Sequence, residues 1–249
     1  MHANGMVIGA LGALGGRQKY PCRLYDDFRR PEQITAWLER IDWVRQWSAS
    51  HWFWGGMLCY SFSKSCTQEW KDAVRQWLLD NSDEATGYWR KGVVPGDRHQ
   101  ALGGFVHIVP IFEHQGWAHP YLERAVDSVL ALQLPDGPWF SGKAVFCATY
   151  LDLDALYVLA YAQRTMPDYR GTDIRLACRR YLSAILRDYA SHGDALYGQH
   201  PHHILAAVGV FGLLQQLLPD MVRDDRAWTD IFSDRRFYQT EAVECEASL

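Results

Sequence analysis

The chain lacks any apolar run long enough to cross a membrane. Its 249 residues contain no stretch of 18 consecutive apolar side chains, whereas a transmembrane helix needs about 20. Residues 1–16 are apolar, but they lack the basic start of a signal peptide and carry glycine throughout. The sequence therefore predicts a protein with neither a membrane span nor a signal peptide.

Paired cysteines and basic clusters are also missing. The six cysteines form no C-x-x-C pair, and four of them lie in segments expected to be helical. A reduced cysteine packs there as a small hydrophobic residue. A formal charge of -4 without a basic cluster argues against a nucleic-acid partner. We therefore expect a cytoplasmic protein that does not bind nucleic acid.

Strand patterns and familiar catalytic motifs are absent as well. Alternating runs of β-branched residues are essentially missing, which argues against a sheet. No P-loop, G-x-G-x-x-G fingerprint, nucleophile elbow or H-E-x-x-H motif occurs. The sequence therefore predicts an all-α protein, and no cofactor is expected.

Hydrophobic and aromatic residues are abundant. Hydrophobic residues make up 48% of the chain and charged residues 22%, which is ordinary for a globular protein. We expect one domain over residues 1–240 and a flexible acidic tail over 241–249. Aromatic residues reach 14%, including 11 Trp. Such content serves packing first, and it favours a ligand cavity lined by aromatic rings.

A polar ring recurs at the start of apolar, helix-like runs at intervals of about 50 residues, which is typical of a repeat architecture. The five rings are His2, His51, His99, Tyr150 and His202. Small residues follow at the same offset in most copies, but the fourth copy carries Asp154 there. Amphipathic runs alternate with the apolar runs. The apolar runs span 3–14, 51–63, 99–114, 147–164 and 202–218, and the amphipathic ones 31–47, 67–79, 120–134, 173–189 and 224–234.

This alternation predicts an α/α toroid, in which an inner ring of helices is wrapped by an outer ring. The chain supplies about five hairpins, fewer than a closed ring of this kind contains. We therefore expect an open ring, or one completed by self-association, by a partner chain or by an upstream segment. Pro110 is expected to kink or shorten the third apolar helix.

Loop motifs resemble those of the terpenoid cyclases and protein prenyltransferases. The segment Gln133-Leu-Pro-Asp-Gly-Pro-Trp139 matches the Gln…Gly-x-Trp motif of squalene-type cyclases. Residues 81–89 are a degenerate copy that begins with Asn81, and residues 193–197 are a fainter one. In that motif the Gln caps helix ends and the Trp packs over the loop. The resemblance implies an α/α toroid fold and a small-molecule enzyme that cyclises or transfers isoprenoids by acid catalysis in a central cavity.

The chain departs from that family at the catalytic motifs. The acidic Asp-x-Asp-Asp motif is absent, and Asp152-Leu-Asp154-Ala155 is the nearest segment. The zinc ligands of the prenyltransferases have no match either. Two alternatives therefore stay open: a sugar-acting toroid enzyme (a lyase, epimerase or hydrolase) and a non-catalytic binding module. The expected ligand is a small molecule, either an isoprenoid or a saccharide.

The candidate catalytic residues are three of the polar rings and one carboxylic acid: His51, His99, Tyr150 and Asp154. Equivalent positions of inner helices face one funnel, where neutral histidine can act as acid or base. Asp154 is expected to be the acid because desolvation raises a carboxyl pKa, and Tyr150 lies one turn away on its face. The alternatives are that each histidine caps its helix or hydrogen-bonds a neighbour, and that Asp154 forms an ion pair with a neighbour such as Arg98 or Lys143.

Six further residues are candidates for substrate binding: His107, His202, Trp52, Trp54, Phe105 and Trp139. The aromatic rings can stack on a sugar or stabilise a carbocation, with core packing as the alternative. The cluster His200-Pro-His202-His203 supplies at most two metal ligands, whereas zinc requires three or four. No metal site is therefore expected.

Overall fold

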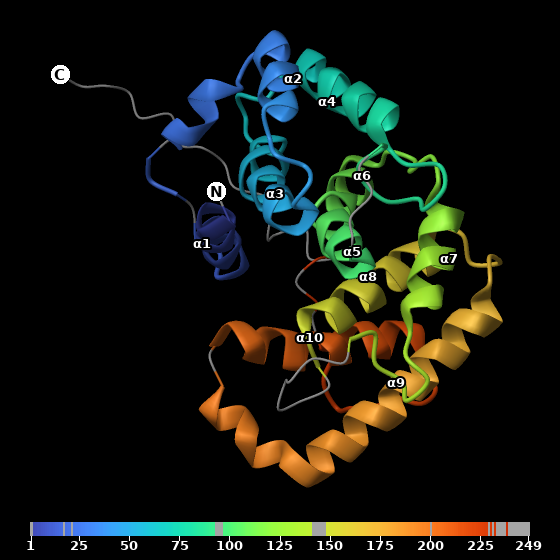
Figure 1. Ribbon diagram of the computed structural model, residues 1–249. Helices are drawn as coiled ribbons and strands as arrows, with labels where there is room; N and C mark the ends of the chain where they lie inside the picture. The colour runs from blue at the N-terminus through green and yellow to red at the C-terminus, as the bar shows by residue number, and fades with distance from the viewer. Residues whose placement is uncertain are drawn as a thin grey trace. The chain divides into compact units, whose positions relative to one another are not determined.

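The computed structural model describes residues 2–16, 18–20, 22–92, 97–140, 148–199, 201–228, 230, 232 and 238 (Figure 1). For residues 196, 197, 201 and 202 it describes the backbone only. Within these ranges the chain is helical and contains no strand, so the all-α prediction is confirmed. No helix in this part of the chain combines the length and the apolar character that crossing a bilayer requires. The predicted tail, 241–249, lies outside the described residues.

The chain divides into two compact units. Unit 1 comprises the described residues of 1–83, 88–120 and 234–249, and unit 2 those of 84–87 and 121–233. The sequence predicted one domain over 1–240 arranged as a ring of hairpins. The ring stays a prediction.

Unit 1 holds the first half of the helices. They are α1 (His2–Ala13), α2 (Pro31–Glu39), α3 (Gln46–Trp52), α4 (Gln68–Asn81), α5 (Arg98–Val106) and α6 (Val109–Gln115). A 3-10 helix covers Arg23–Asp27, and a π-helical turn, Phe53–Leu58, continues α3. Helix α3 packs on α5, α2 on α4, and α1 on the π-helical turn. Amphipathic α2 and α4 bury one face each, as their sequence pattern predicts.

The third predicted apolar helix, 99–114, is broken as expected. Helix α5 ends at Val106 and α6 begins at Val109, with Pro110 in its first turn. A proline has no N–H to donate to the carbonyl four residues earlier, and its ring collides with that carbonyl. The helix therefore stops before Pro110, and His107 lies in the break.

The first predicted amphipathic helix, 31–47, is shorter than predicted. Helix α2 ends at Glu39, and α3 begins only at Gln46. Trp43 donates its indole N–H to the carbonyl of Leu38 at 2.9 Å, and Asp42 accepts from the backbone of Val44 at 3.1 Å. Side chains that bond nearby backbone groups compete with the helix. Residues 40–45 therefore form a loop.

Unit 2 is built around one buried helix. Its helices are α7 (Leu122–Leu132), α8 (Tyr150–Thr165), α9 (Gly171–His192) and α10 (Pro201–Leu217), with a 3-10 helix over Gly193–Gly198. Every residue of α8 from Leu151 to Ala162 is buried. Helix α8 packs against α7, α9 and α10, and Gly209 of α10 permits a close approach to Leu153. The alternation of a buried and an amphipathic helix is confirmed here.

The predicted short helix over 224–234 does not form in its described part. The side chain of Gln215 accepts a hydrogen bond from the backbone of Trp228 at 2.8 Å and donates to the carbonyl of Arg226 at 3.0 Å. The indole of Trp228 donates to Asp224 at 2.8 Å. These bonds engage backbone and side-chain groups in a loop rather than in a helical turn.

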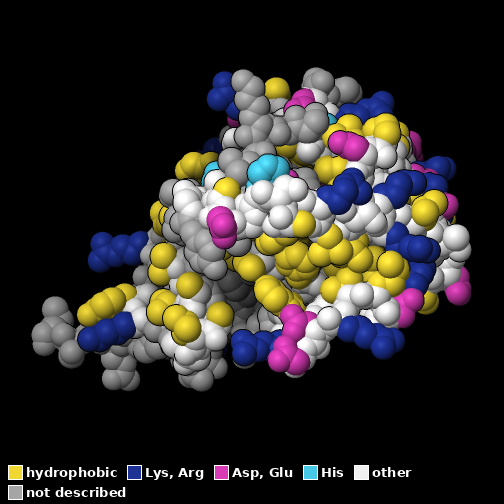
Figure 2. All heavy atoms as spheres, turned by 90° about the horizontal axis from the view of Figure 1, so that it is seen from below, with side chains coloured by type: hydrophobic (Ala, Val, Ile, Leu, Met, Phe, Trp, Pro, Cys, Tyr) yellow, Lys and Arg dark blue, Asp and Glu magenta, His cyan; other side chains and the backbone are white. Residues whose placement is uncertain are grey.

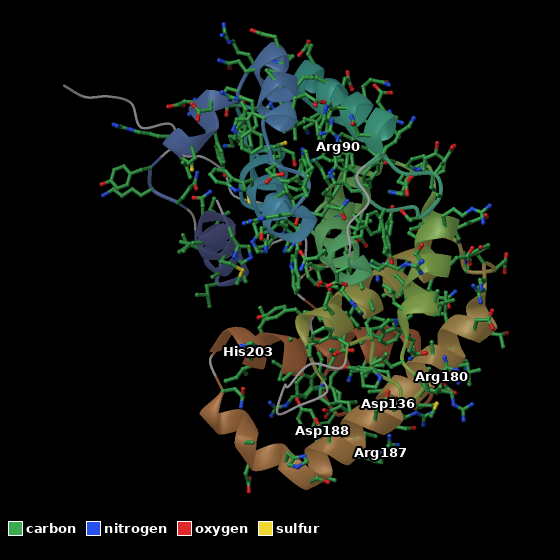
Figure 3. All side chains as sticks on the ribbon, viewed as in Figure 1. Arg90, Asp136, Arg180, Arg187, Asp188 and His203 are labelled. Atoms are coloured by element: carbon green, nitrogen blue, oxygen red, sulfur yellow. The ribbon has the colours of Figure 1, made fainter. Side chains whose placement is uncertain are left out.

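The loop from Gln133 to Trp139 has a structural role, because its side chains bond and pack against neighbouring helices. Gln133 donates to the carbonyls of Gly137 at 2.7 Å and Ala177 at 2.8 Å, and it accepts from Arg180 of α9, labelled in Figure 3. The indole of Trp139 is fully buried and donates to Val129 at 2.9 Å. Gly137 has φ +120°, and a Cβ there would lie 2.7 Å from the carbonyl oxygen of Arg180. Trp139, a predicted substrate-binding residue, thus makes packing contacts.

Candidate metal centre

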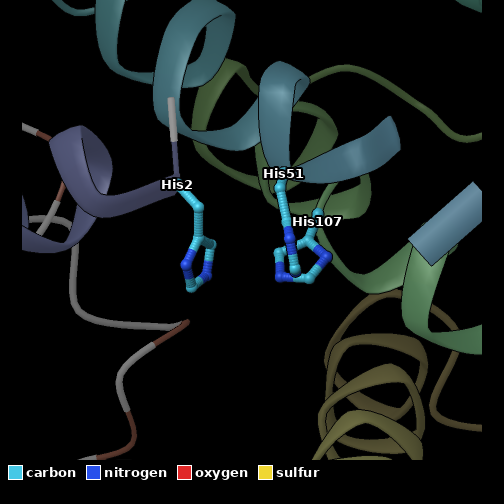
Figure 4. Close-up of side chains that lie close together, drawn as sticks. All are labelled: His2, His51 and His107. Atoms are coloured by element: carbon cyan, nitrogen blue, oxygen red, sulfur yellow. The ribbon is translucent and has the colours of Figure 1, made fainter. Parts of the chain in front are cut away.

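Three histidines of unit 1 come together around one point (Figure 4). His2 lies in the first turn of α1, His51 near the end of α3, and His107 in the break between α5 and α6. One ring nitrogen from each residue lies within 4.8 Å of the other two. Three imidazoles from segments far apart in sequence therefore converge as metal ligands do.

The three imidazole rings lie close together. The centroids of His2 and His51 lie 4.1 Å apart, those of His51 and His107 4.8 Å, and those of His2 and His107 6.0 Å. The ring of His107 is nearly perpendicular to the other two. Nitrogens bound to one zinc ion at about 2.0–2.1 Å would stand roughly 3.3 Å apart in tetrahedral geometry. The separation of up to 4.8 Å between the ring nitrogens is of the same order as that spacing.

The hydrogen bonds of His107 determine which ring nitrogen can bind a metal. Its Nδ1 lies 2.8 Å from the carbonyl oxygen of Gly103 and 3.0 Å from the hydroxyl of Ser50. That hydroxyl donates to the carbonyl of Trp47 at 2.6 Å, so it accepts from His107. Nδ1 therefore carries the proton, and Nε2 keeps its lone pair. Such an outer hydrogen bond is a regular feature of metal-binding histidines.

His107 is also kept neutral. It is the most buried of the three, and burial lowers its pKa well below the ordinary value, with His51 and His2 adding to the effect. Only neutral imidazole binds a metal ion, because the protonated ring has no free lone pair. This ligand is therefore in its binding form at neutral pH.

The position of His2 depends on close packing of α1. The side chain of Asn4 donates to the carbonyl of Gly55 in the π-helical turn at 2.9 Å. A Cβ on Gly5 would lie 2.8 Å from the ring of Trp54, so only glycine allows this approach. π-Helical turns are rare and frequently mark functional sites. Here the turn begins two residues after His51, and α1, which carries His2, packs on it.

Trp54, a predicted substrate-binding residue, forms an apolar side of the cluster. Its ring is buried, and its centroid lies 5.4 Å from that of His2 and 6.0 Å from that of His107. An apolar neighbour lowers the local dielectric and strengthens the field of a bound cation.

His99, predicted to be catalytic, lies outside this cluster. It follows the N-cap Asp97, whose carboxylate accepts from the backbone of His99 at 2.9 Å and contacts its Nδ1 at 2.9 Å. His99 thus hydrogen-bonds a neighbouring residue at the start of α5, which is the alternative to a catalytic role. The recurring register identified His2 and His51, but the third member of the cluster is His107. The sequence feature that could have indicated His107 is Pro110, because this proline ends the helix beside that histidine.

The other predicted substrate-binding residues are spread over the chain. Phe105 is buried against Tyr88 and His119, as a core residue is. Trp52 is half exposed. The side chain of His202 lies outside the described residues, as does His200. His203 is exposed at the start of α10, where Figure 3 labels it.

Asp154 and Tyr150 lie in unit 2, on α8. Asp154 is 2% exposed, and its Oδ2 has no hydrogen-bond partner. Burial, followed by the charge of Asp152, raises the pKa of Asp154 well above its ordinary value. This agrees with the direction predicted from the sequence. The charge of Asp154 and burial together also raise the pKa of Tyr150, with burial the larger cause.

Asp152 has a structural role. It accepts from the backbone N–H of Trp139 at 2.7 Å and from the backbone N–H of Thr149 at 2.9 Å, and the second bond completes a capping box at the start of α8. Burial raises its pKa to about 6, while these hydrogen bonds act in the opposite direction. Asp152 therefore anchors the Gln133–Trp139 loop to α8.

Comparisons with protein-family models, with curated proteins and with solved structures find no match for the chain. Its function is therefore inferred from its own residues and their geometry.

Proposed function

We propose that this protein binds one divalent transition-metal ion, Zn²⁺ by preference, through His2, His51 and His107, and uses it to activate water in a hydrolytic or lyase reaction. The observation that carries the proposal is the state of His107. Its Nδ1 is hydrogen-bonded to Gly103 and Ser50, which leaves Nε2 for a metal in a cluster of three imidazoles. Catalytic zinc sites use three protein ligands and keep the fourth position open.

The ligand set favours zinc over magnesium or calcium. Within the described residues, the cluster contains imidazole groups and no carboxylate. Imidazole suits Zn²⁺ and its transition-metal neighbours, whereas Mg²⁺ and Ca²⁺ require oxygen ligands. Three neutral ligands also leave the full positive charge of the ion at the site. A water on such an ion has a pKa near 7 and acts as a hydroxide nucleophile at neutral pH.

The experiment is a titration of protein prepared without a histidine tag and stripped with a chelator. We expect the wild type to bind about one Zn²⁺ per chain by isothermal calorimetry. His107→Ala, His51→Ala and His2→Ala should each lower the affinity at least about 100-fold, because two ligands do not complete a zinc site. The exposed His192 bonds Asp188 on α9 and is the matched control, so His192→Ala should bind as the wild type does.

Substitution with Co²⁺ provides a second readout, because a tetrahedral histidine site absorbs visible light with characteristic intensity. Loss of that spectrum in His107→Ala, with helical circular dichroism unchanged, separates lost ligation from lost folding. A wild-type protein that binds Zn²⁺ no more tightly than the triple His→Ala variant would refute the proposal.

A second candidate function rests on Asp154. A buried carboxyl group with a raised pKa, whose Oδ2 has no hydrogen-bond partner, can donate a proton to an apolar substrate. This would suit acid-catalysed cyclisation or transfer of an isoprenoid in an α/α toroid completed by self-association or a partner chain. Loss of turnover in Asp154→Asn but not in His107→Ala would favour it over metal-dependent chemistry.

A further inference from the structure

A groove opens beside the loop that separates α2 from α3. It has a volume of about 370 Å³, at the lower end of the range for small-molecule sites. Trp37 and Trp52 line it from α2 and α3, and Arg40, Asp42 and Arg45 line it from the loop. The groove exists because Trp43 and Asp42 end the helix early by bonding nearby backbone groups.

The two tryptophans form a corner of aromatic faces. Their ring centroids lie 6.4 Å apart with an interplanar angle of 61°. Trp37 is nearly buried, whereas Trp52 is 51% exposed. An indole exposed beside a groove offers its face to a ligand, and the C–H face of a sugar ring is a complementary partner.

Arg40 and Arg45 supply hydrogen-bond donors to the same groove. Within the described part of the chain, neither the Arg40 nor the Arg45 guanidinium makes an ion pair or a side-chain hydrogen bond. Asp42, the acidic residue that lines the groove, accepts from the backbone of Val44. Arg90 in the same unit, by contrast, pairs with Glu39 at 2.8 Å. The groove thus keeps a net positive charge on a chain whose formal charge is -4.

We propose that this groove binds an acidic saccharide, a sugar ring that carries a carboxylate. The forked donors of Arg40 and Arg45 match the two oxygens of a carboxylate. Trp52 would stack on the sugar face, and Ser48 and Asp42, which also line the groove, would bond sugar hydroxyls. The site is distinct from the histidine cluster, and the proposal does not rest on metal binding.

The test compares trigalacturonate with its methyl ester, which has the same sugar rings but masked carboxylates. Calorimetry is performed on chelator-treated protein, so that no metal contributes. We expect the acid to bind at least about tenfold more tightly than the ester, because charge-assisted bonds form only with the free carboxylate. The double variant Arg40→Gln/Arg45→Gln should abolish this preference, and Trp52→Ala should weaken both ligands about tenfold or more.

Arg75 is exposed on α4 outside the groove and gives the matched control: Arg75→Gln should keep the preference. Circular dichroism and the melting temperature establish that each variant is folded, and the half-exposed Trp52 gives a variant independent of the arginines. Equal affinity for acid and ester would overturn the proposal, as would failure to bind either. Displacement of trigalacturonate by inorganic sulfate at equal concentration would overturn it too, since it would show a simple anion site.

Discussion

Ser50 accepts a hydrogen bond from the Nδ1 of His107 at 3.0 Å, across 57 residues of sequence. The same hydroxyl donates to the carbonyl of Trp47 at 2.6 Å, which fixes its orientation. One side chain of α3 therefore helps to hold the ring of a histidine beyond α5, together with the carbonyl of Gly103, which also accepts from Nδ1 at 2.8 Å. Hydrogen bonds of this kind make a metal-binding nitrogen more basic and hold it in place.

Removing this hydroxyl should weaken metal binding while the fold is kept. We expect Ser50→Ala to lower the affinity for Zn²⁺ about 10- to 100-fold, the usual effect of losing an outer-shell partner. Gly103 still accepts from His107, so the tautomer survives and the loss stays partial. Calorimetric titration checks this, with Ser48→Ala on the same helix as the control. Equal affinities for the two variants would contradict the role of Ser50.

The close approach of α1 to the π-helical turn gives a second prediction. In Gly5→Ala the new Cβ would lie 2.8 Å from the ring of Trp54 and 2.9 Å from the Cα of Gly55. Overpacking of this kind costs about 1–3 kcal/mol, and moving α1 also moves His2. We expect a lower melting temperature together with weaker Zn²⁺ binding. Gly193→Ala, where a Cβ meets nothing within 4 Å, should leave metal binding unchanged.

Exposed hydrophobic side chains bear on the expectation of self-association. On the face drawn in Figure 2, hydrophobic side chains are exposed next to one another, with Lys and Arg side chains near them. In the described ranges, exposed large hydrophobic residues include Leu176, Leu186, Met221 and Trp228. Soluble monomers rarely expose large contiguous apolar patches, and self-association stays a prediction.

Local chemistry in the sequence predicted much of the fold. Pro110 predicted the break between α5 and α6, and the Gln133–Trp139 segment predicted a packed loop, because each depends on a few neighbouring residues. The early end of α2 was missed because it depends on the indole of Trp43 reaching Leu38, a contact that no helical periodicity reveals. Helix type was therefore easier to predict than helix ends.

The candidate site was predicted only in part for a related reason. The repeat register predicted that His2 and His51 occupy equivalent positions, and the two rings do meet. It also predicted His99 in their company, but Asp97 engages that residue at the start of α5. His107 takes the third place because the break before Pro110 and a bond to Ser50 orient it. Convergence of this kind depends on tertiary packing, which no spacing encodes.

The buried His119 should make the protein less stable in acid. Burial lowers the pKa of His119 to about 4, whereas an unfolded histidine titrates near 6.5. Between pH 6.5 and 4 this histidine is protonated in the unfolded chain but neutral in the folded chain. The free energy of unfolding is therefore highest above pH 6.5 and decreases as the pH falls towards 4. The loss amounts to about 3 kcal/mol. Chemical denaturation of chelator-treated protein from pH 7 to 4 checks this, with a shallower decline expected for His119→Gln.

Asp154 should have the opposite pH dependence, and that separates its behaviour from an ordinary surface carboxylate. Its pKa is raised well above the ordinary value by burial and by Asp152, so the folded chain keeps a proton that the unfolded chain releases above about pH 4. Its contribution to stability is therefore present at low pH and is lost as the pH rises towards the folded pKa. Asp154→Asn removes this titration while it preserves shape, so we expect a melting temperature that equals or exceeds that of the wild type at pH 8. The advantage should shrink by pH 5. Thermal melts of both proteins at a series of pH values measure the difference, with Asp168→Asn as a surface control. A variant that melts well below the wild type at pH 8 would show that the ionised carboxylate stabilises the fold, which the absence of a partner for Oδ2 argues against.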